Sequence, residues 1–194
     1  GINEQVQRMD QIVSYQLQRA VQSHNSSALA RQVNVAEVAS KITSALKKVY
    51  SDKRVETQMS LDPNTVFSGD ERDLMEVLGN ILDNAFKYGN QLVFLSVRRL
   101  PGVAHGVEIT VEDDGAGIAE DQKEFVLQRG ARADTLKQGQ GIGLAVVMDI
   151  VKSYDGQIEL KQSQNLGGAL VTLKFGIDSV APKTEPEARQ ENRQ

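Results

Sequence analysis

The feature that most constrains the fold is a long amphipathic segment at residues 71–88. Its apolar residues recur at spacings of three and four, which is the period of one helix face. Such a helix is marginal in water by itself, so its apolar side has to pack against another element. We therefore predict a helix buried on one side through Leu74, Val77, Leu78, Ile81, Leu82 and Ala85.

Shorter apolar patterns on both sides of this segment predict the elements that it packs against. Helical spacing recurs at 35–50 and 143–154, and strand-like patterns occur at 55–61, 92–99, 107–112, 157–162 and 169–175. Turn residues separate them, with Pro-Gly at 101–102 between two strands that should pair. The predicted fold class is an α/β sandwich, a mixed β-sheet covered on one face by helices.

The two ends of the 194-residue chain differ from this α/β part. Residues 3–24 predict a helix whose apolar stripe is too narrow to fold alone, and residues 24–27 predict a loop. Residues 178–194 carry Pro, Glu, Arg and Gln without periodic apolar residues, which is typical of a disordered tail. We predict three parts, at 1–30, 31–177 and 178–194.

Composition excludes several classes of function. The net charge of −4 gives no general attraction for nucleic acid or an anionic membrane. The absence of cysteine excludes disulfides, thiolate catalysis and cysteine-ligated zinc. No apolar run approaches the roughly 18 residues that span a bilayer, so we expect a soluble fragment without direct membrane contact.

Three polar stretches interrupt the apolar pattern, and the first lies on the long helix. Asn80 and Asn84 are one turn apart, so both carboxamides should lie on one helix face. Their oxygens suit a hard cation such as Mg²⁺, and Lys87 adds a charge for a phosphate. The alternative is that these are ordinary polar residues on a solvated face.

The second stretch, residues 112–118, directly follows a predicted strand. Asp113 at the strand end could accept a hydrogen bond from the exocyclic amine of adenine, and Gly115 and Gly117 allow close approach of a ligand. The alternatives are a tight acidic turn or a calcium loop. The calcium alternative is weak because the EF-hand spacing and its terminal Glu are missing.

The third stretch, residues 139–144, is glycine-rich and opens a predicted helix, where backbone N–H groups could face a phosphate chain. It has neither the lysine ending of a P-loop nor the Rossmann glycine spacing. Residues 129–138 before it are polar and carry three cations. They suit a lid over phosphates, although an ordinary surface loop would also be polar.

Taken in order, N-x-x-x-N-A-x-K-Y, D-D-G-x-G-I and G-x-G-I-G-L resemble the catalytic domains of histidine kinases, which share an ATPase superfamily with gyrase, Hsp90 and MutL. The resemblance covers residues 35–176. It implies the Bergerat ATP-binding fold, with ATP and Mg²⁺ as cofactors. It also implies that residues 1–30 are the end of the dimerisation and phosphoacceptor helix, plus a loop; packing of that helix on its own domain is the alternative.

The resemblance also implies roles for individual residues. The metal would be held by Asn80, Asn84 and Gln140, and adenine would be read by Asp113. Phosphate or lid contacts would come from Lys87, Tyr88, Arg132 and Lys137. The remaining ATP contacts would be made by Gly115, Gly117, Ile118, Gly139, Gly141, Ile142, Gly143 and Leu144.

One departure from the family concerns the phosphorylated histidine, which should be followed by Glu or Asp. His24 precedes Asn-Ser-Ser and His105 precedes Gly, so neither fits. The expected function is therefore transfer of the ATP γ-phosphoryl group to a histidine outside this chain. The expected partners are the dimerisation domain of the same kinase and a response regulator, on the cytoplasmic side of the bacterial inner membrane.

Two other functions compete with this one. An ATP-hydrolysing switch of the gyrase or MutL type would use a Glu where this helix has Asn80, and Glu76 lies a full turn earlier. A noncatalytic nucleotide-binding module would not need the intact set of Asn, Asp and Gly residues. Both features favour phosphotransfer.

Overall fold

The computed structural model describes residues 31–118 and 141–177. In chain order its elements are β1 (Gln32–Asn34), α2 (Val35–Val49), the 3₁₀ helix η1 (Ser51–Lys53), β2 (Glu56–Leu61), β3 (Val66–Ser68), α3 (Glu71–Tyr88), β4 (Leu92–Arg99), β5 (Val107–Asp113), α5 (Gly141–Ser153), β6 (Gln157–Gln162) and β7 (Ala169–Phe175).

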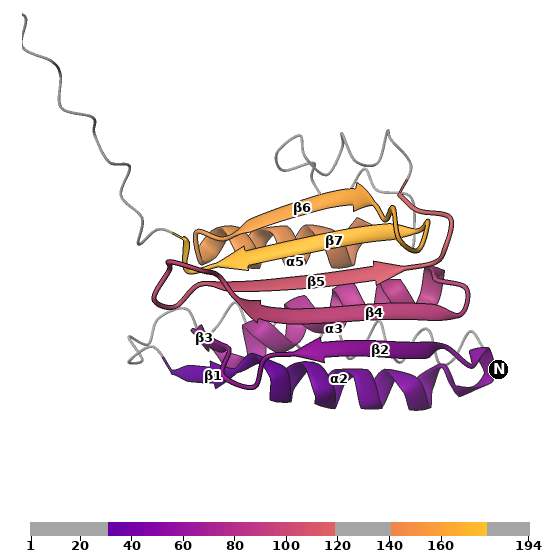
Figure 1. Cartoon of the computed structure of the whole chain (residues 1–194), viewed down its shortest axis with the longest axis horizontal. Coiled ribbons are helices and arrows are strands. Elements are labelled where there is room, and N and C mark those ends of the chain that lie inside the picture. Colours follow the sequence, from indigo (N-terminus) through magenta and orange to yellow (C-terminus); the bar gives the residue numbers. More distant parts are fainter. Residues whose placement is uncertain (1–30, 119–140, 178–194) are drawn as a thin grey trace, which may run out of the picture.

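The main sheet has five strands in the order β2-β4-β5-β7-β6. β2 runs parallel to β4, whereas the other neighbours are antiparallel. Helices α3 and α5 lie side by side behind the sheet, and α2 packs against α3 (Figure 1). Strands β1 and β3 form a separate antiparallel pair. This mixed sheet with helices on one face confirms the predicted fold class.

The core lies between the sheet and the helices. β5 is its central strand, and Ile109 and Val111 on that strand are buried together with Leu95 on β4. Every apolar residue predicted for the buried side of α3 is in this core. Phe86, which closes the last turn of α3, is fully buried as well.

The ends of α3 are fixed by local hydrogen bonds. The Asp70 carboxylate accepts a hydrogen bond from the Arg72 amide at 2.8 Å, as an N-cap, and the acidic Glu71 and Asp73 follow in the first turn. At the other end, the Gly89 amide donates to the Ala85 carbonyl at 2.9 Å. These hydrogen bonds define where α3 begins and ends. Asn80, Asn84 and Lys87 lie between these two ends, in the second half of the helix.

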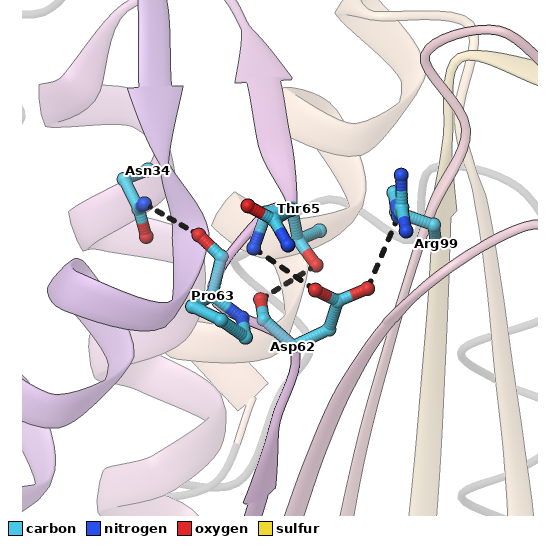
Figure 2. Close-up of polar contacts among 6 residues, drawn as sticks. Asn34, Asp62, Pro63, Thr65 and Arg99 are labelled. Carbon is cyan, nitrogen blue, oxygen red and sulfur yellow. Dashed lines mark hydrogen bonds and ion pairs between the residues drawn. The ribbon is translucent and has the colours of Figure 1, made fainter.

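A polar corner links the turn after β2 to the start of α2 and the end of β4 (Figure 2). The Asp62 carboxylate contacts the Arg99 guanidinium at 3.1 Å. The backbone carbonyl of Asp62 accepts a hydrogen bond from the Thr65 hydroxyl at 2.9 Å. The Asn34 amide donates to the Pro63 carbonyl at 2.9 Å. These contacts place the turn, which the sequence predicts at Asp62-Pro63-Asn64.

Most predicted boundaries agree with the structure to within two residues. α5 begins at Gly141 rather than at residue 143, and β5 extends to Asp113. The sequence patterns missed β1, β3 and η1, each only three residues long, because so short a segment carries no readable period. The helix predicted at 3–24 and the tail at 178–194 lie outside the described residues.

Candidate functional site

Asp113 ends the central strand on the helix-covered side of the sheet. It lies opposite Val93 in the β4–β5 register, and opposed residues point to the same side. It therefore continues the inward series of Ile109 and Val111, and only 5% of it is exposed. The strand that builds the core thus places a carboxylate at its own buried end.

One oxygen of that carboxylate is held by the backbone. Oδ1 accepts from the Gly115 amide at 2.9 Å and from the Ala169 amide at 3.2 Å. Among the hydrogen bonds between described residues, none goes to Oδ2. The carboxylate is therefore oriented through one oxygen, and the other can accept a hydrogen bond from a ligand.

The environment of Asp113 raises its pKa above the ordinary value. Burial is the largest cause, since it disfavours the charged form. The amides of Gly115 and Ala169 and the charge of Lys53 act in the opposite direction but do not cancel the effect of burial. A carboxylate that has lost much of its water favours a partner that donates a hydrogen bond.

Two glycines allow the backbone to close around this carboxylate. A Cβ at Gly115 would lie 2.2 Å from the Tyr88 carbonyl oxygen, and a Cβ at Gly168 would lie 2.2 Å from Asp113 Oδ1. Neither position accommodates a larger residue without movement of the backbone around it. The end of β5, the end of α3 and the β6–β7 turn therefore meet at one point.

The polar residues of α3 lie toward its C-terminal end, where Asn80 and Asn84 are half-buried and Lys87 is exposed. Asn80 Nδ2 donates to the Glu76 carbonyl at 2.8 Å, which fixes its carboxamide. Asn84 is half-buried, and its carboxamide has no hydrogen-bond partner among the described residues. The Lys87 ammonium lies 5.4 Å from the centre of the Tyr88 ring. Carboxamide oxygens suit a metal ion, and an ammonium group suits a phosphate.

The start of α5 lies against this helix. A Cβ at Gly143 would lie 2.8 Å from Asn80 Oδ1. Gly143 of the glycine-rich stretch therefore lies close to Asn80, the first Asn of α3. α5 begins at Gly141, and the backbone amides at this N-terminal end could donate hydrogen bonds to an anion.

Of the other predicted site residues, some lie within the described part of the chain and some outside it. Gly117 and Ile118 follow the turn after Asp113, and a Cβ at Gly117 would lie 3.7 Å from the Gly168 carbonyl oxygen. Leu144 is half-buried in the first turns of α5, and Gly141 and Ile142 precede it there. Outside the described residues lie Arg132, Lys137, Gly139 and Gln140.

Four residues with contacts at this site carried no role in the sequence prediction. Gly168 ends the β6–β7 turn and Ala169 begins β7. The sequence indicates a turn there but not its contact with Asp113. Lys53 gave no signal, because an isolated lysine on a short 3₁₀ helix fits any surface. Asp114 stood inside the acidic stretch, but its spacing does not show that it faces the loop after α3.

Comparison with known proteins decides the family. The sequence profile of the histidine kinase-, DNA gyrase B- and HSP90-like ATPases matches residues 69–179. The chain belongs to this ATPase family. Within it, the chain is similar to the catalytic domains of histidine kinases, and its ATP-binding class follows from the family.

The similar curated proteins are sensor kinases. The chain is 42% identical over 183 residues to the sensor protein PhoQ of Escherichia coli O157:H7, and equally identical to the virulence sensor histidine kinase PhoQ of Salmonella typhimurium strain 14028s. Each match covers 94% of this chain but 37% of the relative. The chain thus spans little more than a third of the length of these relatives.

Solved structures agree on the fold. The Acinetobacter baumannii histidine kinase AdeS matches with a TM-score of 0.65 at 22% identity, covering 90% of this chain and 81% of that one. The ATP-binding domain of PrrB from Mycobacterium tuberculosis matches with a TM-score of 0.61 at 25% identity, covering 77% and 98%. No helix among residues 31–118 and 141–177 is long and apolar enough to cross a membrane.

Proposed function

We propose that this domain binds ATP with Mg²⁺ and transfers the γ-phosphoryl group to a histidine outside residues 31–177. The observation that supports it most is the buried Asp113 carboxylate, oriented through Oδ1 and free to accept through Oδ2. The carboxamides of Asn80 and Asn84 and the ammonium group of Lys87 lie on α3, whose end meets the Asp113 turn. A carboxylate together with these groups suits an adenine nucleotide rather than a single anion.

Adenine recognition rests on Asp113. The exocyclic amine of adenine would donate to Oδ2, whereas guanine presents an oxygen at that position and would face the carboxylate with no hydrogen to share. Gly115, Gly117 and Ile118 would line the base pocket because the turn after β5 approaches the β6–β7 turn so closely. The pocket would therefore select ATP over GTP.

The polyphosphate and the metal would lie over α3 and the start of α5. Asn80, Asn84 and Gln140 would hold Mg²⁺, which supplies charge neutralisation for the phosphates. Lys87 and Tyr88 would contact phosphate or the lid, together with Arg132 and Lys137. The backbone amides of residues 139–144 would face the phosphate chain.

In the transfer step an imidazole nitrogen of the acceptor forms a bond to the γ-phosphorus. The bond from that phosphorus to the bridging oxygen breaks, and ADP leaves with the electron pair. Positioning and charge stabilisation provide most of the catalysis in such transfers. No water is consumed, so a helix with Asn80 in place of a basic Glu suits this step better than hydrolysis.

His105 is badly placed to be the acceptor. It precedes the first residue of β5, whereas Asp113 is the last residue of that seven-residue strand. A strand of that length spans about 23 Å, so His105 and the adenine end lie at opposite ends of the sheet. We propose that the acceptor belongs to the dimerisation domain of the full-length kinase, whose second helix would end within residues 1–30.

The PhoQ relatives motivate the rest of the pathway. We propose that the phosphoryl group passes from that histidine to a PhoP-like response regulator, and that the kinase works on the cytoplasmic side of the bacterial inner membrane. We propose no nucleic-acid partner, because the net charge of −4 gives no general attraction for one.

The proposal is tested by incubating the chain with γ-labelled ATP and Mg²⁺, alone and with a separate two-helix phosphoacceptor domain. Alone it should take up no acid-labile, base-stable phosphate. With the acceptor domain present it should label that domain slowly, because the reaction is bimolecular. Label mapped to His24 or His105 would overturn the assignment. Rapid phosphate release without an acceptor would favour the ATPase switch.

A further inference from the structure

The backbone that joins α3 to β4, residues 86–92, is held by a charge on each side. On one side the Lys53 ammonium donates to the Phe86 carbonyl at 2.8 Å and to the Lys87 carbonyl at 2.7 Å. The last carbonyls of a helix have no partner within the helix, and a cation is favourable there. Lys53 therefore caps α3 from η1, more than thirty residues away in sequence.

On the other side the Asp114 carboxylate faces three consecutive backbone amides. Oδ1 accepts from Asn90 at 2.8 Å and from Gln91 and Leu92 at 3.1 Å each. The Asn90 carboxamide returns a hydrogen bond to the Asp114 carbonyl at 2.7 Å. A carboxylate within a row of amides forms charge-assisted hydrogen bonds, which are stronger than neutral ones.

The segment between these charges touches the adenine end of the site. A Cβ at Gly115 would lie 2.2 Å from the Tyr88 carbonyl oxygen, and a Cβ at Gly89 would lie 3.2 Å from Asp113 Cβ. The same segment carries Lys87 and Tyr88, the proposed phosphate or lid contacts. A shift of residues 86–92 would therefore move the base pocket and the phosphate contacts together.

We propose that Lys53 and Asp114 are positioning residues that form a two-charge clamp on residues 86–92 and thereby set the affinity of the site for the adenine moiety. This inference rests on the proposed nucleotide site. The clamp acts through the contacts of Tyr88 and Gly89 with the Asp113–Gly115 turn, and neither charged group needs to touch the nucleotide.

Ordinary capping would produce a different result from a clamp. Asn90 and Gln91 are exposed, so water can replace the Asp114 carboxylate at their amides and the fold should tolerate its loss. Capping alone would lower the melting temperature and leave affinity unchanged well below that temperature. A clamp that sets the pocket would lower affinity even where the domain is fully folded.

The test is a calorimetric titration of the full chain with ADP in the absence of Mg²⁺, at a temperature well below unfolding. Lys53→Met and Asp114→Ala should each weaken ADP binding about tenfold, the effect expected for losing charge-assisted hydrogen bonds. Lys53→Arg and Asp114→Asn keep a donor or an acceptor and should recover part of the loss. Lys47→Met and Asp52→Ala, which change exposed residues, are the matched controls and should bind like the parent.

In the double variant Lys53→Met/Asp114→Ala, the fold loss of ADP affinity should be smaller than the product of the two single fold losses, because both charges hold the same segment. Single variants that bind ADP like the parent, or a double loss that is simply additive, would overturn the clamp. If Asp114→Ala does not fold, Asp114→Asn and Lys53→Met decide the question. Failure of the parent to bind ADP would instead count against the proposed function itself.

Discussion

The proposed adenine end and the proposed metal end of the site differ in how their side chains are held. At the adenine end, Asp113 is held by amides from two other segments, and Gly115 and Gly168 leave no room for a side chain. At the metal end, the hydrogen bonds between described residues hold Asn80 only to its own helix and give Asn84 no partner. We therefore expect the proposed base pocket to be preformed before ligand binds, and the proposed metal end to be completed by the nucleotide.

Mg²⁺ chemistry explains this difference. The ion keeps several waters and takes phosphate oxygens as ligands, so few protein groups have to be arranged for it in advance. Adenine brings no such ligands, and its recognition depends on one hydrogen bond and on close packing. We therefore expect substitutions at the adenine end to reduce affinity for every adenine nucleotide, and substitutions at the metal end to act only with Mg²⁺.

The strongest test of the rigid end is Gly115→Ala. Its Cβ would meet the Tyr88 carbonyl oxygen at 2.2 Å, so the backbone has to move. We expect ADP affinity to fall about a hundredfold, because overpacking of this kind costs about 1–3 kcal/mol and here displaces the pocket itself. Gly79→Ala is the control: nothing lies within 4 Å of that Cβ, and it should stabilise α3 by about 0.5–1 kcal/mol with normal binding. Normal ADP binding by Gly115→Ala would show that this end is not rigid.

Asp113→Asn tests recognition without a change of shape. The Asn oxygen would keep the amides of Gly115 and Ala169, and its NH₂ group would then point at the adenine amine as a second donor. Leaving the two donors unpaired should cost about 1–3 kcal/mol, or ten- to a hundredfold in ATP affinity. Calorimetry with ATP and GTP measures this, and GTP should stay weak. ATP binding at the parent affinity would disprove the adenine assignment.

Asn84→Ala addresses the metal end. It should remove about a factor of five to ten in the affinity for ATP with Mg²⁺, a typical loss for one weak oxygen ligand, and leave ADP without metal nearly unchanged. Asn80→Ala should behave similarly, although it also removes the hydrogen bond to the Glu76 carbonyl. Equal losses with and without Mg²⁺ would show a folding defect or a direct nucleotide contact instead.

The smallest expected effect is a pH dependence that separates Asp113 from its neighbour. Burial raises the pKa of Asp113, whereas the amides of Leu92, Gln91 and Asn90 outweigh partial burial and lower the pKa of Asp114. As pH falls toward the ordinary range near 4, Asp113 should take up a proton while Asp114 stays charged. ADP affinity should then decline, although the free domain gains stability, because a raised pKa favours the protonated fold.

Titrations of the parent and of Asp113→Asn between pH 7 and pH 4 would check this sign. The ratio of the parent's ADP affinity to that of Asp113→Asn should approach one as pH falls, because protonation removes the charge that distinguishes the two side chains. A ratio that stays constant over the whole range would show that Asp113 does not titrate there.

The sequence predicted the parts of this molecule that carry a period. The apolar face of α3 follows from spacing alone, and the pairing of β4 with β5 follows from two strand-like patterns joined by the Pro-Gly turn. The contact of the β6–β7 turn with Asp113 and the contacts of Lys53 and Asp114 could not be predicted, because they join segments that are far apart in the sequence and depend on how the helices pack on the sheet.

The most direct measurement of the central claim is one calorimetric titration of the parent chain with ATP, with and without Mg²⁺, and with GTP for comparison. We predict that ATP binds without the metal through the adenine end, that Mg²⁺ tightens the binding, and that GTP binds weakly in both conditions. Absence of ATP binding, or equal binding of ATP and GTP, would contradict it.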